Sequence, residues 1–434
     1  MPGGIRCSIY LLALLFLAAM TVPVRAAEAE PSSLNTLIAD ALADNPELAG
    51  DQARWETHVH KARQAGSLDD PMLMLRIQNL LIRDPLAFDR DSTSAKVIGL
   101  SQMVPFFGKR ALARETAERE AEAIGWQLEE RKVELASMVK ENWFRLLFID
   151  SYLAIIEKNI AILDDLSRFN ETMYGVGKGM QQDVLKAQLE RSRMEEMRIS
   201  LGQKRRSLIA TLNSLASRPA EAAIFVDSSL ELTPLTLAAS ELEELAGANR
   251  PLLRVIGARE EKAKAMRSLA ARELYPDFTV SVEYMQRDSS SMDQDGFDMY
   301  AAGVTFNIPL QHERRRAMVA ESESDGRMFS AERGMVMNSI RLGIADSLAK
   351  LEGSRELARL YREGIIPQAE QTLAAVLAAY RAGREGFMAV LESRLVLFNL
   401  ERDYSETMAE HQMQLARLEA VVGTSLPTSL EASD

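Results

Sequence analysis

An internal repeat divides this chain into two halves of similar length. Short landmarks of the first half recur in the second half, in the same order and at separations of about 204 to 206 residues. They are Asn45-Pro46-Glu47-Leu48 with Asn249-Arg250-Pro251-Leu252, Asp70-Pro71 with Tyr275-Pro276, Pro105 with Pro309, Tyr174 and Gly177 with Tyr380 and Gly383, and Val184-Leu185 with Val390-Leu391. We therefore expect two copies of one unit, residues 27–230 and residues 231–434.

Each half contains two segments in which apolar and polar residues alternate. Phe278, Val280, Val282 and Tyr284 alternate with Thr279, Ser281 and Glu283, and Ala302, Val304, Phe306 and Ile308 alternate with Gly303, Thr305 and Asn307. A period of two residues predicts strands. We expect strands at about 277–287 and 299–308, joined by the polar segment 288–298, and at about 72–80 and 95–104 in the first half.

Helical signals fill most of the remaining chain. Long helices are expected at about 109–170 and 312–380, and return helices at about 181–215 and 387–422, after turns rich in Gly. A further helix opens each half and ends near Gly66 or Arg272. At about 1.5 Å per residue, each of the two long helices spans on the order of 90 Å. The predicted unit is helix, strand, strand, long helix, turn, helix.

The first 26 residues have the composition of a secretory signal peptide. Arg6 precedes the apolar run from Ile9 to Met20, and Ala26 follows in a site of small residues. Cys7 is the only cysteine and lies in this leader, so disulfides are not expected in the mature chain. Without Arg6 and Arg25, the net charge falls from −12 to about −14, which makes nucleic acid an unsuitable partner.

Strands of about ten residues have the length needed to cross a bilayer when tilted. An ordinary antiparallel sheet with one solvated face would show the same alternation. Four strands cannot close a barrel, and open edges are not tolerated in lipid, so closure would require other subunits. Two copies would give eight strands with a filled interior, whereas three copies would give twelve strands and a lumen. Trimers are preferred on this ground.

Several motifs taken together resemble the TolC family of outer-membrane efflux proteins over almost the entire mature chain. They are Asn45-Pro46-Glu47-Leu48, Ala65 to Pro71, Leu100 to Pro105 followed by Gly108-Lys109-Arg110, Leu274-Tyr275-Pro276-Asp277, and Tyr-x-x-Gly turns at Tyr174 and Tyr380. The resemblance implies a mainly α protein with a membrane β-barrel: a homotrimer whose twelve-stranded outer-membrane barrel continues as a periplasmic α-helical barrel. Most of the chain would lie in the periplasm, and outer-membrane lipid would surround the strands.

The resemblance also implies partners and a function. The trimer would be a passive exit duct for small toxic solutes or metal cations, delivered by an inner-membrane pump of the RND class through a periplasmic adaptor (membrane fusion) protein. The Gln-x-x-Pro-x-x-Gly-Lys-Arg form, beginning at Gln102, leans toward the heavy-metal branch of the family, which is similar to CzcC and CusC. A duct for protein secretion remains an alternative, and a periplasmic coiled-coil adaptor or scaffold is a further one.

The Gly-rich turns at the far ends of the helices are the expected site of adaptor docking and closure. The residues assigned to docking are Tyr174, Gly177, Gly179, Tyr380, Gly383 and Gly386. In the family's best-known pattern, Asp-Val-Leu-Asp follows the second turn, whereas this chain has Ala389-Val390-Leu391-Glu392. Asp183 precedes Val184-Leu185 at the equivalent place in the first half. Asp183 and Glu392 are therefore candidates for an acidic periplasmic gate, although either could be an ordinary solvated residue.

No motif for catalysis or for a cofactor stands out. The histidines are His58, His60, His312 and His411, and the spacing of His58 and His60 on a helix directs their rings to different faces. We expect no enzyme activity, no cofactor and no metal centre. Methionines on or near the strands, Met72, Met74, Met285, Met292 and Met299, admit a copper or silver hypothesis because thioether sulfur is a soft ligand. Packing is the preferred explanation for them.

Overall fold

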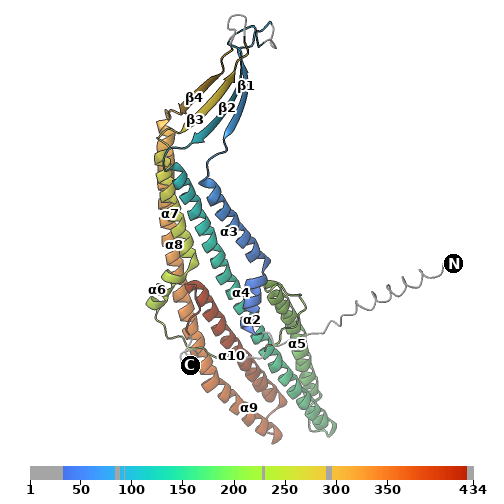
Figure 1. The fold of residues 1–434 in the computed structure, drawn as a ribbon. Helices are drawn as coiled ribbons and strands as arrows, with labels where there is room; N and C mark the ends of the chain where they lie inside the picture. The colour runs from blue at the N-terminus through green and yellow to red at the C-terminus, as the bar shows by residue number, and fades with distance from the viewer. Residues whose placement is uncertain (1–32, 84–87, 92, 227–229, 290–295, 428–434) are drawn as a thin grey trace, which may run out of the picture.

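The computed structural model describes residues 33–83, 88–91, 93–226, 230–289 and 296–427. The expected signal peptide lies outside these residues, as do Met292 and the middle of the segment 288–298. The described chain is an elongated body with a four-stranded sheet at one end and helical hairpins at the other (Figure 1). The same order occurs twice, as the repeat predicts: an opening helical segment, two strands, a long helical segment and a return helix.

The sheet is antiparallel throughout and has the order β1-β2-β3-β4. Its strands are β1 (Met72–Gln78), β2 (Ala95–Val104), β3 (Phe278–Gln286) and β4 (Met299–Phe306). Strands β2 and β3 come from different halves and pair from Lys96↔Gln286 to Val104↔Phe278. The two halves therefore share one sheet, which leaves β1 and β4 as its edges.

Each half opens with two helices, whereas a single one was expected. These are α2 (Leu34–Asp44) and α3 (Pro46–Ala65), and in the second half α6 (Ala239–Asn249) and α7 (Pro251–Arg272). The interruption falls at Asn45-Pro46 and at Arg250-Pro251, because proline disfavours helical backbone in the residue before it but suits the first helical position. Asn45 also caps α3 by accepting a hydrogen bond from the Glu47 N–H at 2.9 Å.

The long helix of the first half, α4 (Lys109–Gly175), is continuous over 67 residues. Its counterpart was expected over about 312–380, and the structure is helical from His312 to Arg381 but not α-helical throughout. This segment consists of α8 (His312–Leu360), a π-helical turn η1 (Tyr361–Ile365) and α9 (Ile366–Arg381). Pro367 explains the interruption, since its nitrogen cannot donate and its ring crowds the carbonyl of Glu363, four residues earlier.

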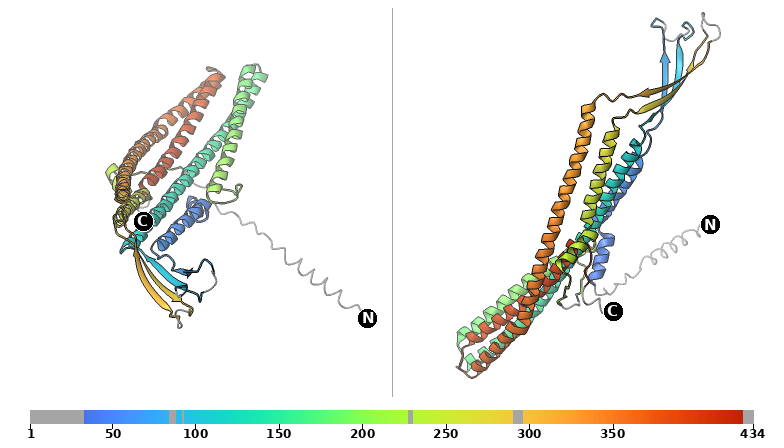
Figure 2. Two further views of the ribbon diagram at one scale, coloured as in Figure 1. Left: turned by 90° about the horizontal axis from the view of Figure 1, so that it is seen from above. Right: turned by 90° about the vertical axis from the view of Figure 1, so that its left-hand side faces the viewer.

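The return helices are α5 (Gln181–Leu215) and α10 (Phe387–Val422). Helix α4 packs against α3 and then α5, and α8 packs against α7 and then α10, so each long helix lies beside two shorter ones (Figure 2). Helix α4 also contacts α7 and α10, which joins the halves. Four hydrophobic clusters lie along these contacts, around Leu146, Ile344, Ile156 and Val255.

Candidate functional site

The two faces of the sheet differ sharply in chemistry. The register places Val282 opposite both Leu100 and Ala302, and Tyr284 opposite both Ile98 and Tyr300. The face to which they belong is almost wholly apolar, yet it is open: Leu75 is 73% exposed, Leu100 55% and Val304 53%. A chain surrounded by water would bury such a face, whereas a chain surrounded by lipid would display it.

Aromatic rings mark both ends of this apolar face. Phe278 and Phe306 face each other at the end near the helices, with ring centroids 6.3 Å apart. Tyr284 and Tyr300 face each other toward the opposite end, 5.2 Å apart. Six residues of strand separate the two pairs, which corresponds to roughly 20 Å. Paired aromatic belts about this far apart are typical of barrels at the two interfaces of a membrane.

The opposite face of the sheet carries the polar side chains. Thr279, Ser281 and Glu283 lie on it, and Arg76 bonds Glu283 across β2 at 2.8 Å. Gly99 lies between them on β2, and it is buried. This polar face, which the alternation of the sequence assigns to a watery lumen, therefore extends across all four strands.

A collar of contacts fixes the sheet on the helices. The Nζ atom of Lys109, at the start of α4, is buried and lies 2.9 Å from an Asp277 carboxylate oxygen and 3.0 Å from the Tyr275 carbonyl. Asp277 also accepts the Phe106 N–H at 2.7 Å, and the rings of Phe106 and Tyr275 stack. The motifs Gly108-Lys109-Arg110 and Tyr275-Pro276-Asp277 thus meet in space and connect the two repeats.

The remaining motifs gather at the same collar. Arg110 donates two hydrogen bonds to the Gly66 carbonyl, at 3.0 and 2.7 Å, and Gln102 donates one to the Asp69 carbonyl at 2.8 Å. The stretch from Ala65 to Pro71 is therefore held by residues on both sides of Pro105. These motifs therefore have an architectural role, because they join the start of the sheet to the helices.

The two tip turns have the same backbone structure. Gly177 and Gly383 occupy the left-handed region, with φ of +75° and +70°. In the first turn, the Gly177 N–H bonds the Tyr174 carbonyl and the Lys178 N–H bonds the Met173 carbonyl, both at 2.9 Å. The second turn repeats both bonds at Gly383 and Arg384. This is the Schellman ending of a helix, and it explains the Tyr-x-x-Gly spacing.

Comparisons with known proteins agree with this geometry. Residues 242–424 match the family model of outer membrane efflux proteins. The chain is also 22% identical, over 93% of both proteins, to the cobalt-zinc-cadmium resistance protein CzcC of Cupriavidus metallidurans. The second half of the chain therefore contains an outer membrane efflux protein domain. Members of this family are channels rather than enzymes, and they combine an outer-membrane part with a large periplasmic helical part.

Solved structures of efflux proteins share the fold. The outer membrane protein VceC of Vibrio cholerae matches with a TM-score of 0.74 and 18% identity, covering 91% of this chain and 97% of VceC. CusC matches with a TM-score of 0.77 and 14% identity, covering 91% of this chain and 92% of CusC. The fold is that of one subunit of a trimeric TolC-like channel, in which the barrel is formed by three chains.

In this efflux protein the two tip tyrosines have different surroundings. Tyr174 is half exposed. The Tyr380 hydroxyl donates to Asn170 Oδ1 at 2.6 Å, and its ring packs edge-on against Phe169. Burial, reinforced by the nearby Asp183 carboxylate, raises the pKa of Tyr380, so its hydroxyl stays protonated and able to donate. Tyr380 thereby ties the second tip to the first, whereas Glu392 is exposed on α10.

Two residues at the tip were missed at the level of sequence. Asn170 and Arg394 are buried, and Arg394 Nε donates to Asn159 Oδ1 at 2.8 Å. Burial lowers the pKa of Arg394, against the effect of the Glu401 carboxylate. A signal for Arg394 does exist, because it interrupts the apolar stripe of Phe387, Leu391 and Phe398 at helical spacing. No comparable signal marks Asn170.

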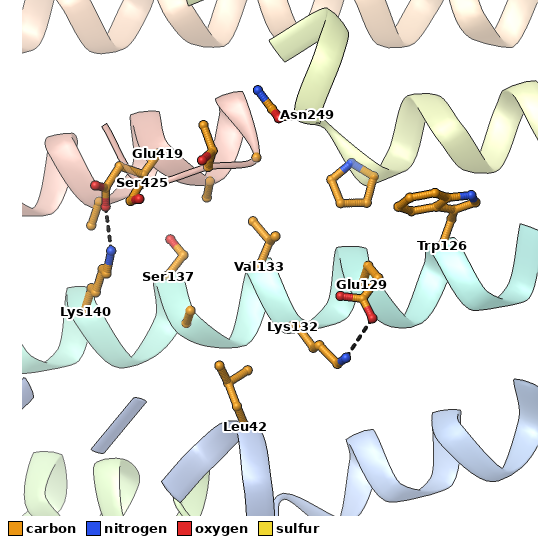
Figure 3. Close-up of a pocket in the computed structure, with 16 residues that line it drawn as sticks. Leu42, Trp126, Glu129, Lys132, Val133, Ser137, Lys140, Asn249, Glu419 and Ser425 are labelled. Carbon is orange, nitrogen blue, oxygen red and sulfur yellow. Dashed lines mark hydrogen bonds and ion pairs between the residues drawn. The ribbon is translucent and has the colours of Figure 1, made fainter. Parts of the chain in front are cut away.

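A groove of about 490 Å³ lies midway along the helices, between α2, α4 and the end of α10. Its charged side chains are already paired, Glu129 with Lys132 at 2.7 Å and Lys140 with Glu419 at 2.6 Å (Figure 3). The groove therefore resembles a gap between packed helices more than a ligand site.

Within the described ranges, no group of three or more His, Cys, Asp or Glu residues is placed to hold a metal ion. His411 is buried, but its ring bonds Ser354 Oγ at 2.9 Å and the Thr233 carbonyl at 3.0 Å, which gives it a structural role.

None of the helices described is both long enough and apolar enough to cross a membrane.

The face assignment predicts different outcomes for neighbouring residues of β4. Val304→Arg should reduce the amount of assembled protein in outer membranes, because a charge at mid-membrane depth on the lipid face costs about 2–4 kcal/mol. Thr305→Arg, equally exposed in the subunit, should assemble normally. Semi-native gel electrophoresis of membrane extracts measures both, and equal losses would contradict the assignment.

The contact of Tyr380 predicts a role in holding the tip closed. Tyr380→Phe removes one hydrogen bond worth about 1 kcal/mol, which should raise the open fraction roughly fivefold. Tyr174→Phe is the matched control at the repeat-equivalent position. Single-channel recordings in planar bilayers measure the open fraction. A similar response of both variants would show that the Asn170 bond does not hold the tip.

Proposed function

We propose that this efflux protein works as a homotrimeric exit duct, which carries metal cations out of the cell as the outer-membrane part of a tripartite system. The observation that supports the assembly most directly is the sheet. Its apolar face is open, and the outer sides of its edge strands β1 and β4 have no strand partner among the described residues. Edges of this kind must be paired within a membrane. Three copies supply twelve strands and a lumen.

The partners in this proposal are a periplasmic adaptor and an inner-membrane pump of the RND class. The tip turns support docking at this end, because apolar side chains are open there: Val176 is 63% exposed and Met180 63%. The turn residues Tyr174, Gly177, Gly179, Tyr380, Gly383 and Gly386 form the proposed docking surface. Gly179 has the tightest surroundings of these glycines, since a Cβ there would lie 3.0 Å from the Tyr174 nitrogen.

Asp183 and Glu392 form the proposed acidic gate. Both lie near the start of a return helix, so three subunits would place six carboxylates around the periplasmic entrance. Such rings attract cations. We expect the double variant Asp183→Asn with Glu392→Gln to lose cation selectivity while still forming trimers. Reversal potentials in a salt gradient measure this, and an unchanged selectivity would remove both residues from the pore.

The likeness to a protein named for cobalt, zinc and cadmium resistance supports metal cations as the cargo. Deletion of the gene should lower the tolerated concentration of at least one of cobalt, zinc, cadmium, copper or silver, and the wild-type gene should restore it. The Val304→Arg variant should fail to restore it, with Thr305→Arg as the positive control. Normal tolerance of all five metals in the deletion strain would contradict the cargo assignment.

A further inference from the structure

The methionines of the sheet all lie on one face. The register places Met72 and Met74 of β1, Met103 of β2, Met285 of β3 and Met299 of β4 on the face of Thr279, Ser281 and Glu283. The opposite face of these strands carries Leu, Ile, Val, Ala, Phe and Tyr, with Lys96, Gln102 and Gln286, but no methionine. A methionine that only filled apolar space would be expected among these aliphatic residues, on the face turned to lipid.

The methionines are also spread evenly along the strands. Five rows cross this face of the sheet, and four successive rows contain at least one thioether, whereas the fifth, Gln78-Ala95, contains none. The four rows are Met103-Thr279-Thr305, then Met72-Ser101-Ser281-Gly303, then Met74-Gly99-Glu283-Ala301, then Arg76-Val97-Met285-Met299. Neighbouring rows are two residues apart, or about 7 Å. The sulfur atoms therefore recur over four of the five rows, from the end near the helices onward.

Two local features show how these side chains are accommodated. A Cβ added to Gly99 would lie 2.9 Å from Met74 Cε and 3.2 Å from Glu283 Cγ. Because Gly99 has no side chain, the side chains of Met74 and Glu283 can both lie over β2 at this position. Met285 and Met299 are direct cross-strand partners, a relation that brings Cβ atoms to about 5 Å and both thioethers within reach of one ion.

Ligands for harder metal ions are scarce on this face. Arg76 and Glu283 are its only charged residues in the four strands, and they neutralise each other at 2.8 Å. Histidine, cysteine and aspartate do not occur on it within these strands. Neutral thioethers prefer soft monovalent cations, whereas divalent zinc and cobalt favour imidazole and carboxylate.

We propose that this face is a ladder of weak thioether sites for soft monovalent cations, Ag⁺ or Cu⁺, inside the barrel. The proposal rests on the proposed function, since it requires the face to line the lumen of the trimer. Three subunits would supply three thioethers at each of the first three rows and six at the fourth. Repeated weak sites suit a duct, because each ion can bind and then move to the next row.

Silver titration of the purified trimer, in chloride-free nitrate buffer and followed by calorimetry, tests the ladder. The wild-type protein should bind silver, and Met285→Leu with Met299→Leu should weaken that binding at least threefold. Replacement of Met72, Met74, Met103, Met285 and Met299 by Leu should weaken it more than tenfold. The matched control is Met328→Leu with Met335→Leu, which removes two exposed methionines of α8 and should leave binding unchanged. Excess zinc should not compete.

Silver binding that is equal in the wild-type and five-leucine proteins would overturn the ladder. Failure of the lumen assignment is detected separately by cysteine labelling, since the mature chain has no cysteine of its own. Thr305→Cys should react with a membrane-impermeant thiol reagent, and Val304→Cys should be protected by lipid. This labelling pattern without methionine-dependent silver binding would overturn the ladder alone. The reverse labelling pattern would overturn the proposed function as well.

Discussion

An open apolar face on a sheet with unpaired edges is stable only when lipid covers the face and other strands cover the edges. Every other feature of this subunit is arranged around that requirement. The two repeats each contribute one hairpin, and β2 pairs with β3 so that the hairpins form one continuous sheet. Neither half could provide the sheet alone, which explains why the collar joins Lys109 of the first repeat to Asp277 of the second.

The collar and the tips differ in the contacts that hold them together. At the collar a buried lysine is satisfied by a carboxylate and a carbonyl, and loss of either partner of a buried pair is costly. This end is therefore built to stay fixed. At the tip, the hairpins are joined by the hydrogen bonds Tyr380–Asn170 and Arg394–Asn159 and by contacts between aromatic rings.

Periodicity was sufficient to predict the sheet. Val280 and Val304 were assigned to one face and Thr279 and Thr305 to the other, and the register pairs Val280 with Val304 and Thr279 with Thr305. The helices were harder to predict, because Pro46, Pro251 and Pro367 interrupt α-helices that were expected to be continuous. Buried polar contacts could not be predicted, because Asn170 and Tyr380 meet only after two halves fold together. Asp183 and Glu392 remain predictions.

The different surroundings of Tyr174 and Tyr380 affect the symmetry that the periplasmic entrance of a trimer would have. A subunit with two equivalent hairpins would give a trimer six equivalent ends, and the periplasmic entrance would have sixfold character. Since Tyr380 is engaged and Tyr174 is open, the six ends fall into two classes of three. A protein docked on this rim, as proposed for the adaptor, would therefore meet two kinds of site in alternation.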